Sequence, residues 1–364
     1  MKKILLLCQQ QGCPIELSPA RYQLIHELRK KNYEIYVLYP GSIKDKTIKN
    51  EIQHFTNTSN FSTQEIRNKI INIAPEYIIA FTYEDTKILY RLMWKMRKTV
   101  FVYYNLEIYT PSMERYAQIA GKYFKERCVM AYLSNKLKEI IYTRGCKIFV
   151  IQDDLRKRTS SEYFISHPNT LLIPNSYVYN DNYEISHERK GIVYSGGLNK
   201  LQLKSLFQNP DNFPDMPITF AGWGDRWFQI QYMKLKKTHP DVAYCNQKLP
   251  PEELSEYLDQ FAVGLIWYSP IRDKNINNIG LASGKLFKHL SLGQPIIVVD
   301  CPGISEVINK YRLGIVIHDI RELQKAYEKI MKRYSYYQKN IQTVYKNKFD
   351  YIKVIQPFLE QLGD

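Results

Sequence analysis

The chain alternates between short, continuous apolar segments and longer segments in which apolar residues recur every three or four positions. The short segments are rich in Val, Ile, Leu and Tyr, which is typical of strands buried on both faces. In the first half they are residues 2–8, 33–39, 77–81, 99–105, 147–152 and 170–175. In the second half they are residues 191–197, 217–224, 242–246, 263–268, 295–300 and 314–319. With helices between the strands, this pattern predicts an α/β protein with two Rossmann-like, doubly wound parallel sheets.

The boundary between the two predicted domains lies in residues 175–191, which are polar and show no periodicity. A chain of 364 residues is long enough for about two domains. We therefore expect a first domain over residues 1–180 and a second over residues 181–340. Because such sheets bind ligands beyond the carboxyl ends of their strands, the two lobes are expected to face one another across a cleft.

Composition indicates a folded protein, with 45% hydrophobic and 24% charged residues. No apolar run approaches the roughly 20 residues that cross a bilayer, and the first residues lack the features of a signal peptide, so we expect a cytoplasmic protein. The six cysteines are scattered without the spacing of metal ligands, which favours reduced thiols over a metal or redox centre.

Positive charge is concentrated in the first half: residues 1–185 contain 27 basic and 18 acidic residues, and the whole chain has a net charge of +15. The densest basic stretch is "KILYRLMWKMRK", residues 87–98, in which Trp94 and other apolar residues alternate with the basic ones. As a helix it would contact a membrane surface or an anionic acceptor, or else would pack on the core with a solvated basic face. No motif typical of nucleic-acid binding occurs, so a nucleic-acid partner is not expected.

Two glycine-containing loops follow predicted strands of the second half. Gly196 and Gly197 precede Lys200 and Lys204 in the first loop, and Gly222 precedes Trp223 in the second. Glycine lets backbone amides approach an anion closely, and nearby lysines add charge. Each loop taken alone is a weak signal, because glycine in a strand-to-helix turn often only relieves steric strain.

A third candidate is "ASGKLFKHL", where Ser283, Gly284 and Lys285 precede an apolar helical run. At a helix N-terminus these residues would hold a phosphate, or Ser283 would simply be the cap and Lys285 a surface residue. Glu306 lies in the first turn of a later helix, where it could accept hydrogen bonds from sugar hydroxyls or only stabilise the helix.

The motifs "GIVYSGGL", "FAGWG", "LPPEELSEYL", "GLASGKLFKHLSLGQPIIVVDCPGISEVI" and "LGIVI" occur in that order. Together they resemble the nucleotide-sugar lobe of GT-B-fold glycosyltransferases, and are most similar to bacterial family 4-like enzymes of capsule and lipopolysaccharide synthesis. The resemblance implies that Gly197 lies at the reaction centre and that residues 283–285 face the donor phosphates. It also implies that Glu306 is the acid beyond a Pro-Gly turn, and that the last helix, residues 341–364, packs back on the first domain.

The chain departs from this family where relatives have a pair of glutamates, since Gly280 and Lys288 stand at those positions. The ribose contact is therefore in question. Lys288 and the adjacent His289 could contribute to donor binding, or Lys288 could lie on the solvent face.

Glycosyl transfer requires stabilisation of the negative charge on a departing diphosphate, which lysines and helix N-termini can provide. Because no D-x-D string occurs in a suitable loop, we expect no metal and no other cofactor. Asp153 and Asp154 are interpreted as a helix cap. Glu107, directly after a predicted strand, is the first candidate for a catalytic base and Glu16 the second, although the resemblance implies a retaining reaction that often needs none.

These features predict a glycosyltransferase that moves a sugar from a nucleotide-sugar donor to a glycan or lipid-linked acceptor at the inner membrane face. Two alternatives remain open. One is an epimerase or hydrolase of the same fold that acts on the nucleotide sugar alone, and the other is a non-catalytic basic adaptor at a membrane surface.

Overall fold

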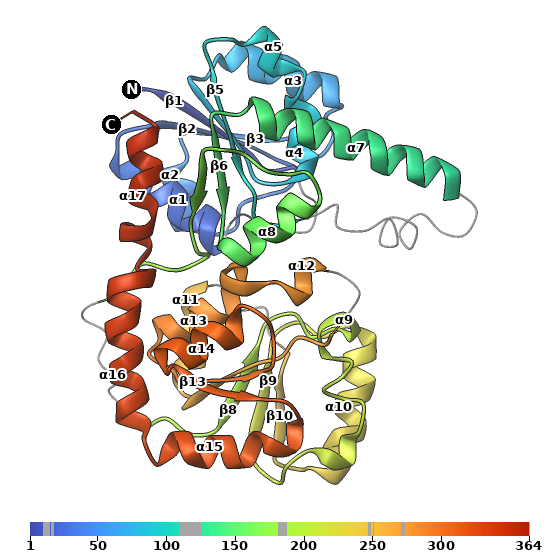
Figure 1. Ribbon diagram of the computed structural model, residues 1–364, viewed down its shortest axis with the longest axis vertical. Coiled ribbons are helices and arrows are strands. Elements are labelled where there is room, and N and C mark those ends of the chain that lie inside the picture. Colours follow the sequence, from blue (N-terminus) through green and yellow to red (C-terminus); the bar gives the residue numbers. More distant parts are fainter. Residues whose placement is uncertain are drawn as a thin grey trace. The chain divides into compact units, whose positions relative to one another are not determined.

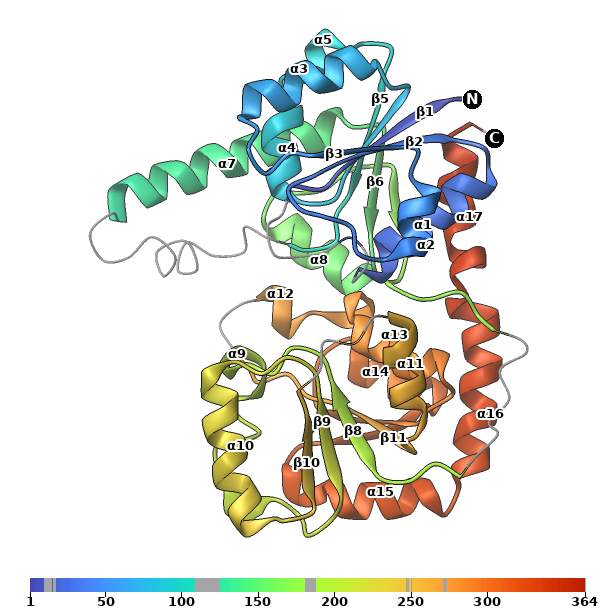
Figure 2. The ribbon, with the colours of Figure 1, turned by 180° about the vertical axis from the view of Figure 1, so that it is seen from behind.

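The structure is a computed structural model that describes residues 1–9, 15, 18–108, 125–180, 188–246, 249, 251–270 and 274–363. The chain forms two compact units (Figure 1, Figure 2). Unit 1 comprises Met1–Asn175, Asp273–Asn275 and Val354–Asp364, and unit 2 comprises Ser176–Arg272 and Ile276–Lys353.

Unit 1 contains a seven-stranded parallel sheet with the order β3-β2-β1-β4-β5-β6-β7. The strands are β1 (Lys3–Leu7), β2 (Glu34–Tyr39), β3 (His54–Asn57), β4 (Tyr77–Ala80), β5 (Val100–Tyr104), β6 (Ile148–Ile151) and β7 (Thr170–Leu172). Its central strands are buried on both faces, because helices cover each side. The strand order reverses between β1 and β4, which opens a ligand-binding position at their carboxyl ends.

The helices of unit 1 are α1 (Pro19–Lys30), α2 (Lys46–Glu51), α3 (Thr63–Ile73), α4 (Tyr83–Leu89), α5 (Leu92–Lys95), α7 (Lys125–Gly145) and α8 (Asp154–Glu162), together with most of α17 (Tyr351–Gln361). Helices α3, α4 and α7 share one apolar cluster with inward residues of β1, β4 and β5. On the other face, Phe358 of α17 contacts the ring of Tyr104 at a centroid distance of 5.9 Å. Residues from both ends of the chain thus contribute to the core of unit 1.

Unit 2 contains a six-stranded parallel sheet with the order β10-β9-β8-β11-β12-β13. Its strands are β8 (Ile192–Ser195), β9 (Ile218–Ala221), β10 (Val242–Cys245), β11 (Val263–Ile266), β12 (Ile296–Val299) and β13 (Gly314–Ile317). Its helices are α9 (Lys200–Leu203), α10 (Arg226–Thr238), α11 (Pro251–Asp259), α12 (Lys274–Asn277, shared with unit 1), α13 (Gly284–Ser291), α14 (Ile304–Tyr311), α15 (Leu323–Met331) and α16 (Tyr334–Val344).

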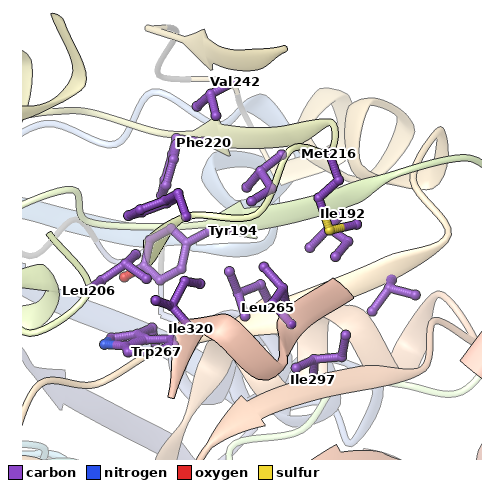
Figure 3. Close-up of a cluster of buried hydrophobic side chains, with 14 of the residues drawn as sticks. Ile192, Tyr194, Leu206, Met216, Phe220, Val242, Leu265, Trp267, Ile297 and Ile320 are labelled. Carbon is purple, nitrogen blue, oxygen red and sulfur yellow. The ribbon is translucent and has the colours of Figure 1, made fainter. Parts of the chain in front are cut away.

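The core of unit 2 has two layers, one on each face of the sheet. One layer joins inward residues of β8, β9 and β11 to α10 and α15, and includes Tyr194 and Trp267 (Figure 3). The other joins β11 and β12 to α13, α14 and α16. Because both faces are apolar, the sheet is held at the centre of the unit, and only the strand ends and loops are left for ligand binding.

Most of the predicted strands are confirmed, and so is the cap of α8, where the Asp153 carboxylate accepts from the Arg156 amide at 2.7 Å. The sequence analysis missed α2 and the edge strand β3, whose residues are mostly exposed and lack an apolar pattern. The single basic helix expected over residues 87–98 is wrong. The chain there forms two short helices, α4 and α5, separated at Tyr90 and Arg91. Thr110 and Pro111, which the sequence indicates as the start of a helix because proline favours the first helical position, lie outside the described residues.

None of the helices in the described part of the chain combines the length and apolar character that a bilayer crossing requires.

A buried carboxylate joins the carboxyl ends of β1 and β4 in unit 1. One oxygen of Asp85 accepts from the amide of Gln9 at 2.7 Å, and the other accepts from the amides of Phe81 and Thr82 at 2.9 and 2.8 Å. Burial raises the pKa of Asp85 to about 6, while these amides and the Arg21 charge favour its ionised form. The carboxylate therefore stabilises the backbone at the switch point of the sheet.

We expect Asp85→Asn to lower the free energy of unfolding by about 1–3 kcal/mol, because an amide group cannot accept from amides on both sides and leaves buried donors without a partner. Urea denaturation would measure this loss. Asp45→Asn is the matched control, since Asp45 caps α2 and Asn caps helices equally well. Equal stability of both variants would contradict the role given to Asp85.

Candidate functional site

The candidate site lies in unit 2, where the strand order changes direction between β8 and β11. The loops after β8 and β9 and the N-terminus of α13 meet at this edge. In open parallel sheets, this is the position where ligands bind.

The two glycine loops touch through their backbones. A side chain on Gly222, which has a φ of +140°, would place its Cβ 2.1 Å from the carbonyl oxygen of Gly196. Gly196 has a φ of +123°, and its own Cβ would lie 2.6 Å from Cε of Lys285. Both positions therefore require glycine, for the backbone conformation and for the close approach.

Hydrogen bonds extend this contact along the loops. The amide of Leu198 donates to the carbonyl of Trp223 at 3.1 Å, and the amide of Asp225 donates to the carbonyl of Leu198 at 3.0 Å. The side chain of Trp223 is 65% exposed, so it is available to a ligand. The paired loops form one rigid edge rather than two independent turns.

Lys285 is half-buried beneath the first loop. Its ammonium donates to Oε1 of Gln202 at 2.7 Å and to the hydroxyl of Tyr194. It also lies 4.4 Å from the ring centroid of Tyr194 and 4.8 Å from that of Tyr268. Aromatic faces and neutral oxygens stabilise a cation without cancelling its charge.

No carboxylate in the described part of the chain pairs with Lys285. Burial consequently lowers the pKa of its ammonium to about 7. A cation held without a counterion next to two glycine loops provides a strong attraction for an anion.

His289, on the same helix, positions the loop rather than the ligand. Its Nδ1 lies 2.7 Å from Oε1 of Gln294, and its Nε2 lies 3.0 Å from Oγ of Ser195. Burial lowers the pKa of His289 to about 4, so the ring is neutral. The Gln294 oxygen fixes the proton on Nδ1, and Nε2 then accepts from the hydroxyl of Ser195, the residue before Gly196.

Lys288 is buried, so the alternative that placed it on the solvent face is wrong. Its ammonium donates to the hydroxyl of Ser255 and lies 4.9 Å from the ring centroid of Tyr177. Burial lowers its pKa to about 8. Helix α13 therefore holds two lysines out of water, Lys285 toward the glycine loops and Lys288 toward α11.

Ser283 is the N-cap of α13, which was one of the two alternatives predicted for it. Its hydroxyl accepts from the amide of Leu286 at 3.3 Å and lies 3.0 Å from the hydroxyl of Tyr268. Its oxygen is thus occupied, and Gly284 begins the helix. The other predicted donor-binding residues are exposed, namely Gly197, Lys200, Lys204 and Glu306.

In unit 1, Glu107 follows β5 and is half-buried, and its role as a base stays a prediction. Glu16 lies outside the described residues. Two positions before Glu107, the side chain of Asn105 is buried, and among the described residues neither its oxygen nor its nitrogen has a hydrogen-bond partner. Sequence reasoning missed Asn105, because only burial distinguishes it from an ordinary strand-end asparagine.

A cavity of about 520 Å³ lies beyond the carboxyl ends of β11, β12 and β13. Its wall includes the polar residues Asn209, Asn212, Asn277, Asp300 and Asp319. None of the predicted donor-binding residues lines it. Amides and carboxylates without a lysine suit a neutral, hydroxyl-bearing ligand better than a phosphate.

Within the described ranges, no three His, Cys, Asp or Glu side chains come close enough together to hold a metal ion. Independence of metal remains an expectation drawn from the sequence.

A protein-family model matches the second half of the chain. Residues 179–348 match the family model described as "Glucosyltransferase 3-like, C-terminal domain". This segment contains both glycine loops and α13. No curated protein sequence matches the chain.

Solved structures share the fold over the whole chain. The structure of Alr3699/HepE from Anabaena in complex with UDP-glucose has a TM-score of 0.71 at 13% identity, and the match covers 100% of this chain and 99% of that one. A glycosyltransferase from Rickettsia africae has a TM-score of 0.69 at 12% identity, covering 99% and 97%. The lipopolysaccharide glycosyltransferase WaaG has a TM-score of 0.66 at 12% identity, covering 99% of each chain.

The resemblance stated from the motifs is therefore confirmed by independent findings: a glucosyltransferase 3-like domain in the second half and a pair of parallel sheets shared with known glycosyltransferases. Residues 179–348 thus match a glycosyltransferase domain, and the whole chain has the two-sheet fold of known glycosyltransferases.

Proposed function

We propose that this glycosyltransferase transfers a sugar from a nucleotide-sugar donor, of the UDP-linked class, to a glycan or lipid-linked acceptor in surface polysaccharide synthesis. The observation that carries the proposal is the Lys285 ammonium, held next to the glycine loops with neutral partners only. Similar structures of HepE were solved with UDP-glucose, with UDP and glucose, and with UDP, which supports this donor class.

In the proposed reaction, the bond between the anomeric carbon and the diphosphate oxygen breaks, and its electron pair stays on the diphosphate. The acceptor hydroxyl oxygen forms the new bond to the anomeric carbon. Its proton passes to the departing oxygen or to a carboxylate such as Glu107. Lys285, the exposed Lys200 and Lys204, and the loop amides would stabilise the charge that develops on the diphosphate, without a metal and with retention of configuration.

We further propose that the protein works at the inner face of the membrane. Trp94, Lys95, Arg97 and Lys98 are all exposed at and beyond α5, which supports a surface that contacts anionic lipid headgroups. An adaptor without catalysis would use this surface alone, and the desolvated Lys285 argues against that alternative. An epimerase or hydrolase would convert the donor without any acceptor, so product analysis with donor alone separates it from a transferase.

Lys285→Met should lower kcat/KM for sugar transfer about a hundredfold, because it removes a preorganised charge from the leaving group. UDP release from a panel of UDP-sugars, with and without glycan acceptors, measures the effect. Lys329→Met is the matched control, since Lys329 lies exposed on α15. Unchanged turnover in Lys285→Met would refute the proposed donor site.

The affinity for UDP should fall as the pH rises above 7. The pKa of Lys285 in the free protein is lowered to about 7, so at pH 8 most of the ammonium has lost its proton and must regain it to bind an anion. The charge on the phosphates of UDP is nearly constant above pH 7, because their last ionisation lies near pH 6. The dissociation constant should therefore rise by up to about tenfold per pH unit.

Titration calorimetry at pH 8, in two buffers with different ionisation enthalpies, should show uptake of nearly one proton when UDP binds. Lys204→Met should weaken binding but keep this uptake, whereas Lys285→Met should abolish it. Binding of UDP to the wild type without proton uptake would show that Lys285 does not face the phosphates.

A further inference from the structure

Unit 1 contains a second concave site, which the proposed donor chemistry does not use. A cavity of about 410 Å³ lies between α3, α4 and α7, beside the carboxyl end of β1. Its wall is basic: it includes Arg67, Lys87, Arg91 and Lys138, with Glu84 as its one acidic residue.

Hydrogen bonds hold Arg67 and Arg91 in place. The guanidinium of Arg67 donates to the carbonyls of Ile88 and Lys87, at 2.9 and 3.1 Å, at the end of α4. Arg91 donates to the hydroxyl of Tyr90 at 2.8 Å and lies 5.5 Å from the centroid of that ring. The two groups are close enough for the charge of Arg91 to lower the pKa of Arg67, an effect that adds to burial.

Most of the positive charge in this cavity is not neutralised by any residue that the structure describes. Glu84 forms an ion pair with Lys87, whereas Arg67, Arg91 and Lys138 have no carboxylate partner in the described part of the chain. In an ion-pair network with only a structural role, the carboxylates would be about as numerous as the cations. Three uncompensated cations in one concavity instead attract an anion with several oxygens, and arginine suits phosphate in particular.

The helix that closes this cavity also carries an exposed apolar stripe. Asn135 and Lys138 of α7 line the cavity, while Met130, Leu133 and Leu137 on the adjoining face are 68%, 52% and 58% exposed. The opposite face is anchored, because Tyr103 donates to Glu139 at 2.7 Å and Tyr142 donates to the carbonyl of Val102 at 3.0 Å. In both views α7 extends outward from the sheet of unit 1 (Figure 1, Figure 2).

We propose that the cavity of Arg67, Arg91 and Lys138 binds a terminal phosphate or diphosphate group of a lipid, whose chain lies along the Met130, Leu133 and Leu137 stripe. The ligand combines the two chemistries that α7 presents side by side, an anion and an apolar chain. This inference rests on the proposed function, in which it selects the lipid-linked acceptor over the soluble glycan, and its test is independent of donor binding.

The test compares binding of the full chain to phosphatidylcholine vesicles that contain either phosphatidate, with an exposed phosphomonoester, or phosphatidylglycerol at the same surface charge. Inorganic pyrophosphate, titrated by calorimetry into protein saturated with UDP, probes the cavity without a lipid chain and with the proposed donor site filled. The cavity variant is Arg91→Gln with Lys138→Gln, which leaves the hydrogen bonds of Arg67 in place. The stripe variant is Leu133→Ser with Leu137→Ser, and Lys325→Gln with Lys329→Gln in unit 2 is the charge-matched control.

The wild type and the control should prefer phosphatidate vesicles by about tenfold, and the cavity variant should lose both this preference and the binding of pyrophosphate. The stripe variant should bind vesicles several-fold more weakly but bind pyrophosphate as the wild type does. Equal binding to both vesicle types would overturn the proposal, as would a cavity variant no weaker than the control. Pyrophosphate binding without any vesicle preference would assign the cavity to free phosphate and overturn the lipid assignment.

UDP binding by each variant, measured as thermal stabilisation, reports on the proposed donor site of unit 2 alone. If the wild type binds UDP but shows no vesicle preference, the lipid site is disproved and the proposed function is left intact. Absence of UDP binding in the wild type counts against the proposed function and not against the lipid site.

Discussion

The candidate donor site depends on one constraint: the Lys285 ammonium is partly withdrawn from water and pairs with no carboxylate in the part of the chain that the structure describes. Tyr194 and Tyr268 provide the aromatic faces and Gln202 the neutral oxygen that make this burial tolerable. Gly196 favours glycine because its φ of +123° strains other residues, and a Cβ there would also lie 2.6 Å from Cε of Lys285. A carboxylate partner would restore the ordinary pKa of Lys285, and it would also cancel the charge that attracts a diphosphate.

Each unit holds a charged side chain at the switch point of its sheet, and the two charges are opposite in sign. In unit 1 a buried carboxylate, Asp85, gathers backbone amides from β1 and β4, and its bonds are satisfied within the unit. In unit 2 the corresponding edge holds a cation, Lys285, whose charge no carboxylate among the described residues balances. Satisfied polar groups rigidify a fold, whereas an uncompensated buried charge is costly and is typical of a functional site.

The arrangement of cations distinguishes the two candidate ligand sites. Lys285 contributes a single desolvated charge next to exposed glycine backbone, which suits a diphosphate that must leave after each turnover. The cavity of unit 1 has guanidinium groups held by helix carbonyls and a tyrosine, beside the apolar stripe of α7. Basic residues that appear in the sequence as one stretch, 87–98, are thus divided between this cavity and the exposed surface around Trp94.

The sequence by itself determined the α/β class, the two parallel sheets, nearly all of their strands and the loops that carry the candidate chemistry, because apolar periodicity and helix caps are local properties. It did not reveal the exposed edge strand β3, the break between α4 and α5, or the orphan amide of Asn105. Tertiary structure alone decided that Lys285 is desolvated, since its partners Tyr194 and Gln202 lie 91 and 83 residues away in the chain. It also decided that Lys288 is buried and that Arg67, Arg91 and Lys138 share one cavity, because burial and charge balance depend on neighbours that no local pattern specifies.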